Sequence, residues 1–301
     1  MGHGVDMGQA GFDVIVCGSL HLDIRVEAPH LPRIDETAVG RSWAQVCGGK
    51  GGNQAVQAAR QDARTAMIGR VGADAFGDKL LANLDAAGVE RSAVGIDAAA
   101  GSGMSVAIVE ENGDYGAVIV SGANLVIPPE EIAAAWSRLR GARVLVLQNE
   151  VPHAVNVAAA HAARADRAIV ILNAAPAREC GDDLLDLVDV LVVNRVEAQM
   201  LSGAPVSGRA SAHEALPALG AARRSVVVTL GGEGLVASTV QGEVSEIAAI
   251  PVVVVSTHGA GDCFVGALAS RLAAGEGLFK ACRFANAAAA RFVSTPVTAW
   301  N

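Results

Sequence analysis

The chain has 301 residues, of which 51% are hydrophobic and 18% charged, enough for one large domain with an extensive apolar core. Its net charge of −8 and its 3% aromatic content argue against nucleic acid and anionic membranes as partners, because these require basic or stacking surfaces. The five cysteines are scattered, with no C-x-x-C pair, which argues against zinc or a disulfide framework and favours a reducing compartment, the cytoplasm.

The first eleven residues are glycine-rich and polar and lack an apolar signal-peptide core. We expect residues 1–11 to be a disordered leader or a cloning remnant. No apolar stretch has the length of a membrane-spanning helix.

From residue 12 onward, short β-branched runs alternate with helical patterns. The predicted strands are 12–17, 65–68, 144–148, 168–173, 188–194, 225–230 and 252–256. The predicted helices are 52–60, 78–87, 129–140, 152–164, 182–187, 195–202, 210–219, 262–274 and 278–295. Continuous apolar strands separated by helices predict an α/β three-layer sandwich around a mostly parallel sheet.

Two segments, about 22–46 and 102–120, interrupt this alternation. The first has no convincing helix, and the second reads as two strands on either side of Glu111-Asn112-Gly113-Asp114. Since Asn-Gly is a strong hairpin signal, we expect a small antiparallel sheet that projects from the main domain as a lid. Such a sheet has no helix cover of its own, so it must bury one face on a substrate, on the main domain or on a partner chain.

The segment 256–264, Ser-Thr-His-Gly-Ala-Gly-Asp-Cys-Phe, carries the clearest chemistry. It predicts a strand, a glycine turn and a helix start, where backbone N–H groups and the helix dipole favour an anion. Asp262 would lie in the first turn of that helix. A carboxylate binds phosphate poorly there, but it is well placed to take a proton from a hydroxyl that attacks phosphate. The segment therefore predicts phosphoryl transfer.

A second glycine-rich segment, 48–55, reads Gly-Gly-Lys-Gly-Gly-Asn-Gln-Ala and opens another predicted helix. It lacks the Walker A spacing. Its glycines allow close approach of a ligand, Asn53 offers a donor and an acceptor to sugar hydroxyls, and Lys50 adds a positive charge. Taken alone, each of the two glycine-rich segments also fits a purely structural helix start.

Together these segments resemble signatures of the PfkB (ribokinase-like) carbohydrate kinases, and among them those of the ribokinases. The matching motifs are G-S-x-x-x-D at 18–23, G-G-K-G-x-N-Q-A at 48–55 and T-x-G-A-G-D at 257–262. Further matches follow in the family's order at 148–150, 173–177, 194–198, 229–234 and 284–288. The resemblance implies one ribokinase-like kinase domain over 12–301, with the lid segments inserted.

The resemblance also implies roles for individual residues. The expected reaction is ATP-dependent phosphorylation of the primary hydroxyl of a small sugar, ribose first, with Mg²⁺ as cofactor and a homodimer formed through the lid. Asp262 would be the base, and the backbone N–H groups of Gly259, Ala260 and Gly261 the anion hole. The implied sugar-binding residues are His21, Asp23, Gly49, Lys50, Asn53 and Glu150. The implied nucleotide and phosphate residues are Asn194, Thr229, Gly231, Gly234 and Asn286, with Glu197 meeting Mg²⁺ through water.

Three features depart from the family pattern. Ser256 stands where the family has an aspartate near a monovalent cation, so activation by K⁺ is expected to be weak or absent. His21 stands where ribokinases carry asparagine, so a sugar other than ribose could be the substrate. The tail 292–301 lacks an expected glycine and a final helix. A kinase of a nucleoside, deoxyribose or a ketose, and a non-catalytic sugar-binding protein, therefore remain alternatives.

Overall fold

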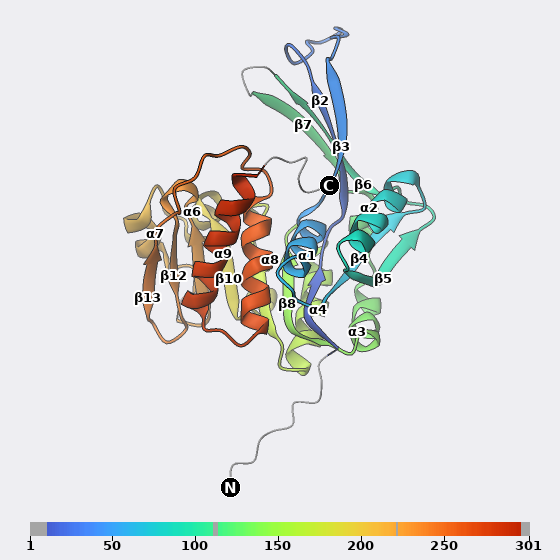
Figure 1. Ribbon diagram of the computed structural model, residues 1–301. Helices are drawn as coiled ribbons and strands as arrows, with labels where there is room; N and C mark the ends of the chain where they lie inside the picture. Colours follow the sequence, from blue (N-terminus) through green and yellow to red (C-terminus); the bar gives the residue numbers. More distant parts are fainter. Residues whose placement is uncertain (1–10, 111–113, 221, 296–301) are drawn as a thin grey trace.

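The computed structural model describes residues 11–110, 114–220 and 222–295. Within them, nine strands form one sheet in the order β13-β12-β11-β10-β9-β8-β1-β4-β5 (Figure 1). Neighbours are parallel from β11 to β5, whereas β12 is antiparallel to β11 and to β13. The strands are β1 (Phe12–Cys17), β4 (Thr65–Gly72), β5 (Glu90–Asp97), β8 (Ala142–Gln148), β9 (Ile169–Asn173), β10 (Val190–Asn194), β11 (Ser225–Thr229), β12 (Leu235–Ser238) and β13 (Val244–Ile247).

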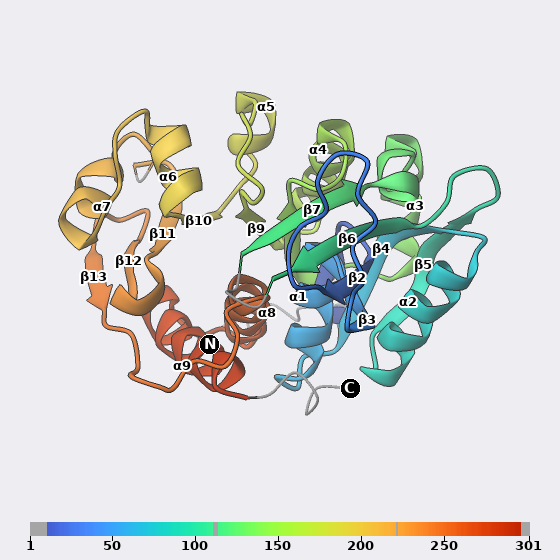
Figure 2. The ribbon, with the colours of Figure 1, turned by 90° about the horizontal axis from the view of Figure 1, so that it is seen from above.

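Helices cover both faces of this sheet (Figure 2). One layer holds α1 (Lys50–Ala59), α2 (Ala75–Ala86), α8 (Ala260–Ala273) and α9 (Leu278–Val293), and the other holds α3 (Pro129–Arg138), α4 (His153–Ala165), α5 (Asp182–Leu185), α6 (Arg195–Ser202) and α7 (Arg209–Ala215). Because side chains alternate along a strand, Val14 and Val16 pack against the layer that contains α1 and α8. Ile15 and Cys17 pack against the opposite layer, which contains α3 and α4. The predicted three-layer α/β sandwich is confirmed. In the parts of the chain that the structure describes, no helix has the length and apolar character needed to cross a bilayer.

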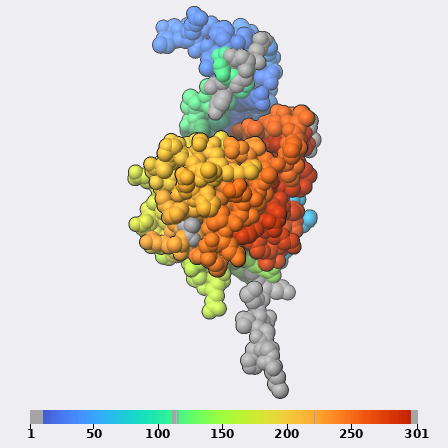
Figure 3. Space-filling model, turned by 90° about the vertical axis from the view of Figure 1, so that its left-hand side faces the viewer, coloured from blue at the N-terminus to red at the C-terminus, as the bar shows by residue number. Residues whose placement is uncertain are grey.

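A second sheet of four strands stands clear of the body (Figures 1 and 3). Its order is β3-β2-β6-β7, from β2 (His21–Glu27), β3 (Ser42–Gly48), β6 (Gly103–Val109) and β7 (Tyr115–Val120). We call it the lid. The outer pairs are antiparallel as predicted, but the central pair, β2 and β6, is parallel. The reason is that β2 follows β1 and β6 follows β5. Since β1 and β5 run in the same direction, their carboxyl ends lie on the same side of the main sheet, and β2 and β6 leave it in the same direction. Of the predicted hairpin turn, 111–113 lie outside the described residues, as do 1–10 of the predicted leader and 296–301 of the tail.

The strand predicted at 252–256 is wrong. This apolar run pairs with no strand, and Val253 is 84% exposed. Two of its N–H groups, those of Val255 and Ser256, donate instead to the carbonyl of Val293 at the end of α9. A run of β-branched residues favours extended backbone, yet a strand also needs a neighbour to pair with. The prediction conversely missed β5, β12 and β13. The edge strands β5 and β13 are partly exposed and therefore lack a continuous apolar pattern, whereas β12 is buried but only four residues long.

Candidate active site

The first turn of α8 is built on a glycine in the left-handed region. Gly259, the N-cap, has φ 79° and ψ 0°, and no side chain caps this helix end. The N–H of Ala260 donates to the carbonyl of Thr257 at 3.2 Å, while Gly259 and Gly261 line a cavity in front of the helix. The predicted glycine turn and helix start are present, with the helix beginning at Ala260 rather than Asp262.

Asp262 points from this turn toward α1 and is only 7% exposed. Two amides from α1 hold its carboxylate: Gln54 Nε2 donates to Oδ1 at 2.9 Å, and Asn53 Nδ2 donates to Oδ2 at 3.2 Å. Burial raises the pKa of Asp262 above its usual range, and the charge of Lys50 partly opposes that shift. A buried carboxylate with a raised pKa is a better proton acceptor than an exposed one.

The cavity in front of α8 joins residues from five parts of the sequence. It encloses about 200 Å³ between α1, α8 and the ends of β9, β10 and β11. The predicted site residues that line it are Lys50, Asn194, Thr229, Glu197, Gly259, Gly261 and Asp262. The carboxyl ends of parallel strands are the usual place for a ligand in a sheet of this kind, so the cavity is the candidate active site.

A second group of predicted residues meets at the start of α1. Glu150 Oε2 accepts the backbone N–H of Lys50 at 2.9 Å and the hydroxyl of Ser19, and it lies 3.8 Å from His21 Nδ1. Gly49, the N-cap of α1, has φ 82° and lets the helix start approach the backbone of His21. Glu150 thus places a negative charge at the positive end of the helix dipole.

The base of the lid carries the remaining predicted sugar-binding groups. Ser105 Oγ on β6 donates to Asp23 Oδ1 on β2 at 2.5 Å. The side chain of His21 is buried, and its Nε2 lies 3.3 Å from Asn124 Nδ2. The same amide nitrogen donates to the carbonyls of Leu20 at 2.8 Å and Ser121 at 2.9 Å, so its contact with His21 is the longest of the three.

Asn194 and Glu197 form a capping box at the start of α6. The side-chain oxygen of Asn194 accepts the N–H groups of Val196 and Glu197, and Glu197 accepts the N–H and the side-chain amide of Asn194. Burial raises the pKa of Glu197. Within the described segments, no group of three or more His, Cys, Asp or Glu side chains could hold a metal ion. One buried carboxylate facing the cavity fits a hydrated Mg²⁺ held mainly by phosphates, which is the usual form for this ion.

Three predicted nucleotide residues lie apart from the cavity lining. Gly231 and Gly234 flank the short turn between β11 and β12, and both have positive φ, 60° and 92°. Asn286 Nδ2 on α9 donates to the carbonyl of Ala248 at 2.8 Å, joining the helix to the segment after β13.

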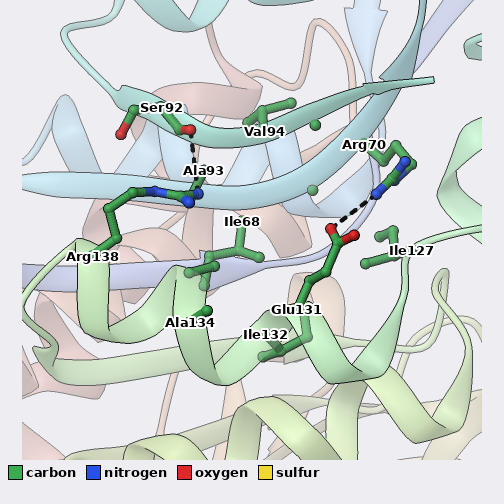
Figure 4. A pocket seen from close by; sticks show the side chains of 13 residues that line it. Ile68, Arg70, Ser92, Ala93, Val94, Ile127, Glu131, Ile132, Ala134 and Arg138 are labelled. Atoms are coloured by element: carbon green, nitrogen blue, oxygen red, sulfur yellow. Dashed lines mark hydrogen bonds and ion pairs between the residues drawn. The ribbon is translucent and has the colours of Figure 1, made fainter. Parts of the chain in front are cut away.

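Another cavity of similar volume lies beside the edge strand β5, between this strand and α3 (Figure 4). Its charged side chains are already engaged. Arg70 pairs with Glu131 and with Asp97 at 3.1 Å each, and Arg138 donates to the carbonyl of Ser92. It holds none of the predicted site residues.

Comparison with known proteins agrees with this geometry. The profile of the pfkB family carbohydrate kinases matches residues 12–299. The chain belongs to this family. The carbohydrate kinase predicted from the sequence is therefore confirmed.

Several relatives match over most of their length. A ribokinase of Bacillus subtilis is 35% identical over 92% of this chain and 91% of its own, and one of Lactococcus lactis is 34% identical over 85% and 82%. A deoxyribokinase of Salmonella typhi is 33% identical over 85% and 84%. A solved structure of Arabidopsis thaliana ribokinase with ribose and ATP superposes with a TM-score of 0.87 at 31% identity, covering 94% of this chain and 92% of that one.

The structure adds four polar residues to the site that the sequence did not single out. Gln54 contacts Asp262, Ser19 contacts Glu150, Ser105 contacts Asp23, and Asn124 contacts His21. Gln54 and Ser19 lie inside the matched motifs, so the motif letters were the available signal. Ser105 and Asn124 lie outside them, and only the fold brings them to the site.

Proposed function

We propose that this carbohydrate kinase uses ATP to phosphorylate the primary hydroxyl of a small sugar, with ribose as the first candidate. The observation that carries the proposal is the buried carboxylate of Asp262 beside the uncapped glycine start of α8, at the mouth of a cavity that Lys50 also lines. The names of the relatives support the choice of ATP and ribose.

In the proposed reaction, Asn53, Lys50 and Asp23 hold the sugar hydroxyls, and Asp262 accepts the proton of the attacking hydroxyl. The raised pKa of Asp262 strengthens it as an acceptor. The glycine turn of α8 directs backbone N–H groups and a positive dipole end toward the transferred phosphate. Mg²⁺ would neutralise phosphate charge, with Asn194 and Glu197 facing its water shell. Closure of the lid over the sugar would exclude water, which otherwise competes for the phosphate.

The test is ATP turnover against a panel of ribose, deoxyribose, ketoses and nucleosides. We expect one sugar to stimulate turnover, and Asp262→Asn to lower kcat by about 10²- to 10⁴-fold, the range of general-base catalysis. If a sugar raises the melting temperature while none stimulates turnover, the chain is a sugar-binding protein and the proposal fails.

Deoxyribose is the second candidate because of His21. The ring is buried between Asn124 and Glu150. It therefore occupies space that the smaller asparagine would leave for the ribose hydroxyl that deoxyribose lacks. The relative from Salmonella typhi named deoxyribokinase is as similar to this chain as several ribokinases are. Comparing the kcat/KM ratio for ribose and deoxyribose in wild type and His21→Asn tests this reading. An unchanged ratio would show that His21 does not choose the sugar.

We propose weak or absent activation by K⁺. Ser256 offers a neutral hydroxyl where a carboxylate would attract a cation, and its Oγ already accepts the N–H of His258 at 3.3 Å. Turnover measured with K⁺ and with a large organic cation should be similar in wild type. Ser256→Asp should introduce a dependence on K⁺. A strong response of the wild type would refute the argument.

We also propose that two copies associate through the lid. Trp43 and Val118 are each 68% exposed, Val120 is 52% exposed, and the strand register places all three on one face of the lid, which projects from the main body (Figure 1). Light scattering should show a dimer that Val118→Arg disrupts. Ile34→Arg is the control, because Ile34 is even more exposed, at 95%, but lies in the loop between β2 and β3. A wild-type monomer at micromolar concentration would refute the proposal.

A further inference from the structure

The carboxylate of Asp262 has two unlike oxygens. Oδ1 lies in the protein interior, where it accepts a 2.9 Å hydrogen bond from Gln54, whose side chain is fully buried. Oδ2 is part-buried and accepts a longer bond, 3.2 Å, from Asn53. Asp262 lines the cavity, and because the interior bond holds Oδ1, Oδ2 is the oxygen left to face the cavity.

The amide of Gln54 is itself incompletely satisfied. Among the described residues, its Oε1 is buried and has no hydrogen-bond partner. An unpaired buried acceptor is unfavourable, but turning the amide around would point its oxygen at the ionised carboxylate, which is worse. The charge of Asp262 therefore fixes the amide, and the amide in turn fixes Asp262.

We infer that Gln54 is a positioning residue for the base: it occupies Oδ1 and reserves Oδ2 for the hydroxyl of the substrate. Asn53 can leave Oδ2 to bind a sugar hydroxyl, whereas Gln54 has no access to the cavity and stays with Oδ1. The donated bond also favours the ionised form of Asp262, in opposition to burial, and keeps the base able to accept a proton. The inference rests on the proposed role of Asp262.

Three variants test it. Gln54→Met removes the donor while keeping the length of the side chain, and Gln54→Glu puts a second carboxylate beside Asp262. Gln57→Met is the matched control, because Gln57 is another buried glutamine one turn further along α1. Each is measured for kcat and KM, for the pH profile of kcat and for melting temperature, beside Asp262→Asn.

We expect Gln54→Met to lower kcat about 10- to 100-fold, which corresponds to the loss of one hydrogen bond to a charged group. The KM for ATP and the KM for the sugar should change little. Removing the donor raises the pKa of Asp262, so the acid limb of the profile should move to higher pH, and further in Gln54→Glu. Gln57→Met should match wild type in kcat and profile. An unmoved acid limb in both Gln54 variants, or wild-type kcat in Gln54→Met, would overturn the inference. A wild-type kcat in Asp262→Asn would instead refute the proposed base itself.

Discussion

Helices α1 and α8 cross with almost no space at Gly266. A Cβ on Gly266 would lie 2.7 Å from the carbonyl oxygen of Gln54, 2.8 Å from the backbone N of Ala58 and 2.8 Å from Cβ of Gln57. Two of these atoms are backbone and cannot rotate away. This close approach is also what brings Asn53 and Gln54 to Asp262, so Gly266→Ala tests the packing and the site together.

Two opposing effects set the magnitude. Alanine gains about 1 kcal/mol of helix propensity over glycine in a helix interior. Overpacking costs about 1–3 kcal/mol, and the upper part of that range applies because ordinary contact at about 3.4 Å requires the helices to separate by roughly 0.6 Å. We expect a net loss of about 1–2 kcal/mol, or a fall in Tm of about 2–8 °C for a chain of this size. The same separation would stretch the bond from Gln54 to Asp262 beyond hydrogen-bond length and lower kcat about 10-fold or more.

Thermal unfolding and steady-state turnover measure both effects. Gly232→Ala is the control, since a Cβ there would meet nothing within 4 Å and its backbone lies outside the left-handed region. We expect that variant to keep the wild-type Tm. The reasoning is refuted if Gly266→Ala raises Tm, as helix propensity alone would predict, and leaves kcat unchanged.

Three further predictions concern Asp262, Asn194 and Gly259. Burial raises the pKa of Asp262 above 3.8, so its ionised form destabilises the fold above the raised pKa and this cost disappears below about pH 3.8, where folded and unfolded chains are both protonated. The difference in Tm between Asp262→Asn and wild type should therefore increase with pH. A difference that does not change with pH would contradict the raised pKa of Asp262. Asn194→Ala removes the cap of α6 and should cost about 1 kcal/mol in denaturant unfolding; a cost no greater than that of Ser202→Ala, at the other end of α6, would show that the cap contributes nothing. Gly259→Ala places a Cβ 3.3 Å from the ring of Phe292 at φ 79°. The resulting strain of about 1–2 kcal/mol should distort the turn and raise KM for ATP. An unchanged KM for ATP would show that this turn does not bind the phosphate.

The sequence by itself determined the layers of the fold and the local shape of each motif. Alternating apolar strands and helical patterns are enough for a three-layer sandwich, because each element must bury its own apolar face. The glycine turn before Asp262 and the glycine start of α1 are also local, since left-handed φ values at Gly259 and Gly49 depend on residue type more than on neighbours. The apolar run before Ser256 misled the prediction because its extended propensity finds no pairing strand.

Only the tertiary structure decided how these motifs combine into a site. Asn53 and Gln54 reach Asp262 across 209 and 208 residues of sequence, and that contact exists because Gly266 lets two helices touch. The sequence names a carboxylate beside a phosphate turn. Its burial, its raised pKa and the choice of the oxygen that faces the cavity come from helices packed around it, because solvent exclusion and hydrogen-bond direction depend on atoms that are distant along the chain.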